Sequence, residues 1–256
     1  MLINSLSTSL FLEDNASSLL SSNFFKSFLN FSNDSPNLTI SFSELTTFLH
    51  EFGHALHGML ANSTYSSLSG TSVYRDFVEL PSQIIENWAV EKDFLDRFAK
   101  HYKTGEVLPK ETFDKMLESK KVGSGLGAIQ MLQRCLYDMN LYDKYNPANP
   151  TPTDDIWLQI NKQLDVMDFY AKTHYQANWI HVNTHPVYMY GYLWSEVYAM
   201  DMFTQFEKNG LLDTKTGVRY RELILSNGTQ RDILKAVNEF LGRPSDNKAY
   251  VKSLGL

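Results

Sequence analysis

Two histidines and a glutamate stand close together in the stretch His50-Glu51-Phe52-Gly53-His54, which has the HExxH pattern. On a helix that advances about 100° per residue, residues four apart lie one turn from each other and point the same way. Two imidazoles at this spacing can share one Zn²⁺ ion. Glu51 lies beside them, where its carboxylate can act on a metal-bound water. The chemistry that these residue types predict is zinc-assisted hydrolysis.

The residues around the motif predict that it lies on a helix within the stretch 41–62. Counted from Leu45, the two histidines fall at about 140° and 180° around such a helix, opposite an apolar stripe. Ser41 and Glu44 fit the S-x-x-E capping box, which marks a helix start. The alternative is that both histidines are structural and bind no metal. The apolar stripe consists of Leu45, Leu49, Phe52, Leu56, Met59 and Leu60.

A second helix is predicted soon after the first, because apolar residues recur at helical spacing from Phe77 to Trp88. Pro81 is tolerated only in the first turn of a helix, so this helix should begin between Val78 and Leu80. Several polar side chains then run down the face opposite the apolar one: Glu79, Gln83 and Glu86.

A catalytic zinc site needs a third protein ligand and one open position for water. His57 shares a face with His54 but lies two turns from His50, too far along the axis for one ion. Glu79 is the best-placed carboxylate, and position alone does not exclude Glu86. The full set of candidates is Asp76, Glu79, Glu86 and His57.

The composition limits the possible partners and the compartment. The 256 residues are 43% hydrophobic and carry a net charge of -6. The chain has no basic block, so nucleic acid and anionic membranes are not expected as partners. Cys135 is the single cysteine and cannot form an internal disulfide. We also find no signal peptide and no membrane-spanning run, so we expect a cytoplasmic protein.

The chain is expected to be all-α, because no convincing alternating strand pattern occurs. We expect residues 1–37 to form an irregular or poorly ordered segment and residues 38–256 to form the helical region. Within 122–127, repeated glycines predict a hinge between two helices rather than a phosphate loop. Thr153 is expected to cap a helix through about His174, and Gly242 to end a helix that begins at Thr229.

The stretch from His174 to Tyr198 is dense in aromatic residues and histidines. One interpretation is a core helix from Tyr188 onward, in which Tyr188, Tyr192 and Val197 are packing positions. The other is that some of the tyrosines face the metal, where a hydroxyl can donate to a substrate oxyanion.

Four stretches together resemble the family of zinc metallopeptidases that includes thimet oligopeptidase, oligopeptidase A and dipeptidyl carboxypeptidase. The resemblance covers about Leu38 to Leu256 and only the C-terminal portion of the family. It implies the all-α catalytic region of a zincin-type oligopeptidase, without the N-terminal half of the family fold. The stretches are HEFGHALHG, GTSVYRDFVELPSQIIENW, YGYLWSEVYAMDMF and FLGRPSDNKAYVKSLGL.

The resemblance also implies the roles of individual residues. His50, His54 and Glu79 would bind one Zn²⁺ per chain, and Glu51 would act as general base. Tyr192 matches a family tyrosine and is the expected oxyanion donor. Three further residues of the same segment are expected to contact substrate: His181, His185 and Tyr190.

The expected activity is that of a metalloendopeptidase or a peptidyl-dipeptidase on short peptides. The segment before Tyr192 departs from the family pattern, since Met189 and His185 stand where the family has tyrosines and the paired glycines are absent. An alternative is therefore a catalytically weak zinc-binding remnant or one part of a split enzyme, with a second chain supplying the N-terminal half.

Overall fold

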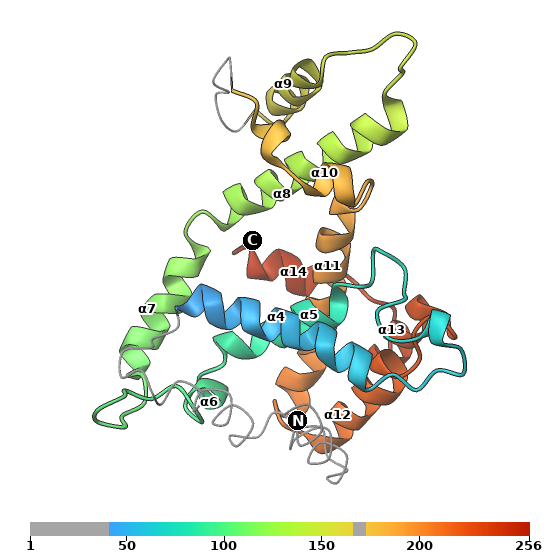
Figure 1. Cartoon of the computed structure of the whole chain (residues 1–256). Helices are drawn as coiled ribbons and strands as arrows, with labels where there is room; N and C mark the ends of the chain where they lie inside the picture. The colour runs from blue at the N-terminus through green and yellow to red at the C-terminus, as the bar shows by residue number, and fades with distance from the viewer. Residues whose placement is uncertain (1–40, 166–172) are drawn as a thin grey trace.

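The computed structural model describes residues 41–165 and 173–256, and this part of the chain is built from helices (Figure 1). Its only β pairing is one isolated antiparallel bridge between Lys100 and Val107. The expected all-α class is confirmed. The segment 1–37, expected to be irregular, lies outside the described residues. Among the described helices, none has the length and apolar character needed to cross a membrane.

The helix that carries the HExxH motif is α4, Phe42–Met59. The Ser41 hydroxyl accepts a hydrogen bond from the Glu44 backbone N–H, and the Glu44 carboxylate accepts one from the Ser41 N–H, so the predicted capping box is present. The predicted apolar stripe is the buried face, while Met59 is exposed at the end of the helix. The buried apolar residues of this face are Leu45, Leu49, Phe52 and Leu56.

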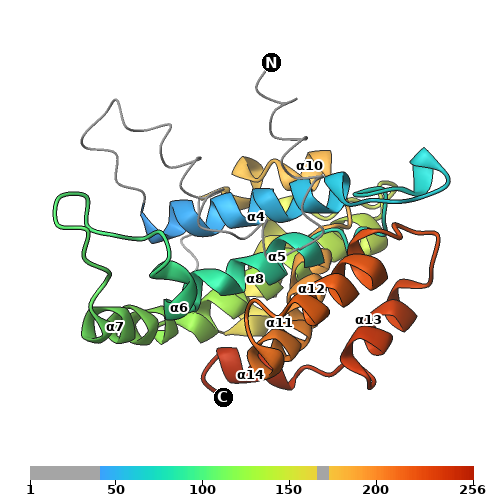
Figure 2. The same ribbon diagram turned by 90° about the horizontal axis from the view of Figure 1, so that it is seen from below.

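Helix α5, Leu80–Glu86, lies between α4 and the long helix α11, Met189–Asn209, and contacts both (Figure 2). Pro81 is in its first turn, as predicted. Trp88 follows α5 in a short 3₁₀ turn and packs edge-on against Phe203 and Phe206 of α11. These three helices therefore contribute to the main hydrophobic core, which fixes α5 relative to α4.

The remaining helices either pack around α4, α5 and α11, which together are called the body here, or form an extension from it. Helices α8 and α9 lead away from the body (Figure 1) and share a second apolar cluster that includes Tyr137 and Trp157. The helices are α6 (Lys92–Leu95), α7 (Lys110–Lys121), α8 (Ser124–Met139), α9 (Thr153–Leu164), α10 (His181–Thr184), α12 (Thr214–Tyr220), α13 (Ile233–Leu241) and α14 (Lys248–Ser253). Short 3₁₀ and π segments join several of them.

Two predicted helix boundaries were wrong, and one predicted break is shorter than expected. The helix from Thr153 ends at Leu164 instead of His174, because Asp165 takes a left-handed backbone conformation with φ 47°. The last long helix begins at Ile233 instead of Thr229, since the Asp232 side chain caps it. The predicted break between two helices is present between α7 and α8 but is only two residues long, with Gly123 at φ 76° and the later glycines inside α8.

Gly53 allows α4 and α5 to approach closely. A Cβ atom at this position would overlap the Pro81 carbonyl oxygen and lie 2.5 Å from Ser82 Cα. We expect Gly53→Ala to lower the free energy of unfolding by about 1–3 kcal/mol, because one of the helices must shift. Gly58→Ala is the matched control on the same helix, since a Cβ there meets nothing within 4 Å. Urea unfolding of both variants tests this; equal stability of the two would contradict it.

Candidate metal centre

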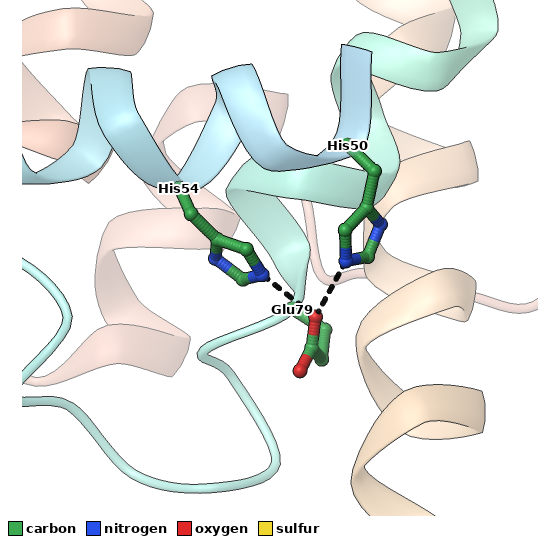
Figure 3. Close-up of side chains that lie close together, drawn as sticks. All are labelled: His50, His54 and Glu79. Carbon is green, nitrogen blue, oxygen red and sulfur yellow. Dashed lines mark ion pairs between the residues drawn. The ribbon is translucent and has the colours of Figure 1, made fainter. Parts of the chain in front are cut away.

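Three potential metal ligands meet between α4 and the start of α5. His50 Nε2 lies 3.2 Å and His54 Nε2 3.1 Å from the same oxygen, Glu79 Oε2 (Figure 3). One ligand atom from each residue lies within 4.8 Å of the others. Within the described residues, no other group of three such side chains is brought this close.

The local sequence explains this geometry. The two histidines are one turn apart on the face of α4 away from the core, so their rings project in the same direction. Glu79 directly precedes α5 and is 5% exposed. The close packing at Gly53 brings the start of α5 beneath the histidines.

The electrostatics of these groups are strongly coupled. Burial would lower the pKa of His50, but the carboxylates of Glu79 and Glu86 outweigh it and raise this pKa to about 9. Burial would likewise raise the pKa of Glu79, but hydrogen bonds from His50, His54 and Tyr188 hold this pKa far below its usual range. These contacts therefore favour the ionised form of the Glu79 carboxylate.

The other candidate third ligands take different positions. Glu86 Oε1 lies 2.7 Å from His50 Nδ1, on the side of the ring away from Glu79. Asp76 contacts the Tyr190 hydroxyl at 3.5 Å. His57 is fully buried, and neither ring nitrogen has a hydrogen-bond partner among the described residues. The geometry thus separates Glu79, which faces both histidines, from Glu86, which supports one of them.

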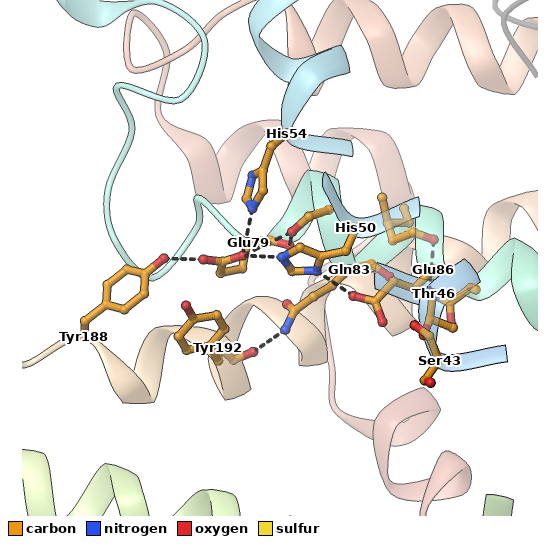
Figure 4. Close-up of polar contacts among 12 residues, drawn as sticks. Ser43, Thr46, His50, His54, Glu79, Gln83, Glu86, Tyr188 and Tyr192 are labelled. Atoms are coloured by element: carbon orange, nitrogen blue, oxygen red, sulfur yellow. Dashed lines mark hydrogen bonds and ion pairs between the residues drawn. The ribbon is translucent and has the colours of Figure 1, made fainter. Parts of the chain in front are cut away.

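Glu51 and Tyr192 flank the three ligands. Glu51 is the residue after His50 on α4, and its side chain is exposed. Burial raises the pKa of Tyr192, and the carboxylates of Glu79 and Glu51 raise it further, so the phenol remains protonated. Gln83 Nε2 donates to the Tyr192 carbonyl oxygen at 3.0 Å and ties α11 to α5 (Figure 4).

Tyr188 is a site residue whose role the sequence left open between core packing and a position facing the metal. Its hydroxyl donates a hydrogen bond to Glu79 Oε1, the oxygen that does not face the histidines (Figure 4). The side chain is 5% exposed, and its ring lies 5.0 Å from that of Tyr192. The only sequence signal was its position in the aromatic-rich segment.

The expected substrate-contacting residues lie at the edge of this aromatic group. The ring centroids of His181 and His185 are 5.9 Å apart. His181 lies 6.2 Å from Tyr192, and His185 lies 5.6 Å from Tyr188. Tyr190 points elsewhere, with its hydroxyl toward Asp76.

A cavity of about 1190 Å³ adjoins the centre on the side of Glu86. Helices α5, α7, α8, α11 and α14 contribute to its walls. Its lining includes carboxylates and ammonium groups, among them Glu86, Glu196, Lys120 and Lys252. The cavity gives Glu86 access to solvent behind His50.

The raised pKa of Glu196 on α11 should make the stability of the folded protein depend on pH. Burial, with the nearby Glu86 carboxylate, raises its pKa to about 7 from 4.5. Between these values the folded protein binds more protons than the unfolded chain, so stability falls as the pH rises. We expect Glu196→Gln to gain stability relative to the wild type as the pH rises through this window. Urea unfolding at several pH values tests this, and a difference independent of pH would contradict it.

The donor set fits a catalytic zinc ion. Two imidazole nitrogens and one carboxylate are a common ligand set for such an ion, and three protein ligands leave a fourth position open. The Glu86 carboxylate on His50 Nδ1 resembles the outer hydrogen bond that orients metal-binding histidines.

Comparison with known proteins shows which family this chain is similar to. The sequence model of peptidase family M3 matches residues 11–256, which extends closer to the N-terminus than the expected start near Leu38. Saccharolysin of Saccharomyces cerevisiae is 34% identical over 87% of this chain and 32% of its own length. Oligopeptidase A of Salmonella typhimurium is 34% identical over 83% of this chain and 32% of its own.

Dipeptidyl carboxypeptidase of Escherichia coli is similar to the same degree, with 33% identity over 83% of this chain and 32% of its own length. The chain thus spans about a third of the length of these relatives. The family match covers nearly the whole chain and includes the three potential ligands. The chain therefore belongs to peptidase family M3.

Proposed function

We propose that this protein is a zinc-dependent peptidase that hydrolyses short peptides. The observation that carries this proposal is the convergence of His50, His54 and Glu79, with Glu51 beside them on the same helix. Family membership supports the peptidase activity, and the names of the relatives support oligopeptides as the substrate class.

His50, His54 and Glu79 would hold the metal. A bound zinc ion supplies a Lewis acid that polarises the scissile carbonyl and activates water. The exposed Glu51 carboxylate accepts the proton of the attacking water and passes it to the leaving amine. Neither proton transfer requires Glu51 to bind the metal.

The Tyr192 hydroxyl would donate a hydrogen bond to the oxyanion of the tetrahedral intermediate. Its raised pKa keeps the proton on the phenol, which is what a donor requires. His181 lies next to Tyr192, and His185 lies next to His181; both would contact the peptide beyond the scissile bond.

The function is tested by metal removal. We expect the purified chain to bind one zinc ion and to cleave a fluorogenic peptide. A chelator should abolish the cleavage and added zinc should restore it, because the proposed chemistry depends on the ion. Metal content and cleavage rate are measured on the same samples.

The outcomes separate the alternatives. Cleavage that persists in the metal-free protein would contradict the proposal. Bound zinc without cleavage would favour the alternative of a remnant or of one part of a split enzyme. That alternative is then tested by adding the N-terminal two-thirds of a relative such as oligopeptidase A and measuring cleavage again.

A further inference from the structure

The Glu79 carboxylate uses its two oxygens in different ways. Oε2 faces both histidines and also accepts a hydrogen bond from the Ser82 hydroxyl at 3.2 Å. Oε1 accepts the hydrogen bond of the Tyr188 hydroxyl. A carboxylate can rotate about its terminal bond, so a contact on Oε1 decides where Oε2 points.

We propose that Tyr188 is a positioning residue of the metal centre, which fixes the Glu79 carboxylate with one oxygen directed at the metal position. This inference rests on the proposed zinc function. Tyr188 would not touch the metal or the substrate, and it would act only through Glu79. The role differs from that of Tyr192, which would donate to the substrate.

The position of Tyr188 is itself fixed by a buried carboxylate from another helix. Asp138 of α8 is 1% exposed and accepts three backbone N–H groups at the start of α11. The donors are the backbone nitrogens of Val187 at 3.0 Å, Tyr188 at 2.8 Å and Met189 at 3.1 Å. Hydrogen bonds to an ionised acceptor are stronger than neutral ones, and the start of a helix favours negative charge.

The other side of Tyr188 is held by the segment before Glu79. The Arg75 guanidinium lies 5.6 Å from the centre of the Tyr188 ring. At Gly191, one turn along, a Cβ atom would lie 2.8 Å from the Arg75 carbonyl oxygen, so α11 and this segment approach closely. The Tyr188 hydroxyl is therefore positioned by contacts within the protein, with Asp138 and Glu79 at opposite ends of the residue.

Removing the hydroxyl alone tests the proposal. Outer hydrogen bonds to metal ligands are worth about 10–100-fold in metal affinity. We expect Tyr188→Phe to weaken zinc binding by this factor, measured by competition with a chromogenic chelator in the absence of substrate. Tyr220→Phe is the matched control, because the Tyr220 hydroxyl is buried and has no hydrogen-bond partner among the described residues.

A second variant tests the connection through Asp138. Asp138→Asn keeps the size of the side chain but removes the charge that holds the three N–H groups. We expect weaker zinc binding than in the wild type, and we expect the double variant to bind zinc as Tyr188→Phe alone does, since both changes act through one contact. Thermal melting of each variant shows whether the fold is intact.

The result that would overturn the proposal is a Tyr188→Phe variant that binds zinc as tightly as the wild type. In that case the wild-type affinity still supports the proposed function. If the wild type itself binds no zinc, the proposed function and this inference both fail. An equal loss of affinity in Tyr220→Phe would show a general packing effect and would also overturn the assignment to Tyr188.

Discussion

Replacing Glu51 with glutamine is expected to reduce the turnover of peptide by about 100-fold to 10,000-fold, the range for loss of a general base. Glutamine keeps the shape of the side chain but cannot accept a proton. Glu51 points away from the core and is exposed on α4, so we expect the fold and the zinc content to remain unchanged. Steady-state cleavage of a short peptide and metal analysis of the same sample measure both quantities.

Glu118→Gln is the control for this variant, because Glu118 is an exposed glutamate on α7. It should retain the turnover of the wild type. A Glu51→Gln variant with full activity would contradict the proposed mechanism. A variant that loses its zinc together with its activity would instead mean that Glu51 supports the ligands.

The arrangement of the two histidines could be predicted from sequence because it depends on one helix. The capping box at Ser41 and the apolar stripe fix where α4 begins and which face is buried. The orientation of His50 and His54 then follows from helix geometry. Information within one amphipathic helix was sufficient for this part of the site.

The choice between Glu79 and Glu86 required the packing of two helices. Both carboxylates lie on the polar side of the predicted second helix, so periodicity could not separate them. The separation comes from the close contact at Gly53, which sets which end of α5 lies under the histidines. Glu79 then faces both rings, whereas Glu86 reaches only His50 Nδ1.

Tyr188 and the helix end at Leu164 illustrate what local patterns miss. The buried position of Tyr188 is compatible with simple core packing, and its hydroxyl contact depends on Asp138, which is far away in sequence. The α9 helix ends at a non-glycine residue, Asp165, in a left-handed conformation. An aspartate gives little indication in the sequence that a helix ends there, because this conformation is usually taken by glycine. The sequence therefore predicted that the helix continues to His174.

The second large effect is expected from Glu79 and Glu86, the two glutamates that helix periodicity could not separate and that the family resemblance distinguishes. Glu79→Ala should abolish stoichiometric zinc binding, because it removes the carboxylate that faces both histidines. Glu86→Gln should weaken zinc binding by about 10–100-fold without abolishing it, since Glu86 only orients His50. Isothermal titration of the metal-free variants with zinc gives both affinities.

These two variants control for each other, because each removes one carboxylate beside His50. The half-exposed Glu86 and the buried Glu79 differ in which nitrogen of that ring they face. Complete loss of zinc in Glu86→Gln with retention in Glu79→Ala would reverse the assignment of ligand and support. Equal, modest losses in both would mean that the two histidines dominate the affinity, and a carboxylate ligand at this centre would then be excluded.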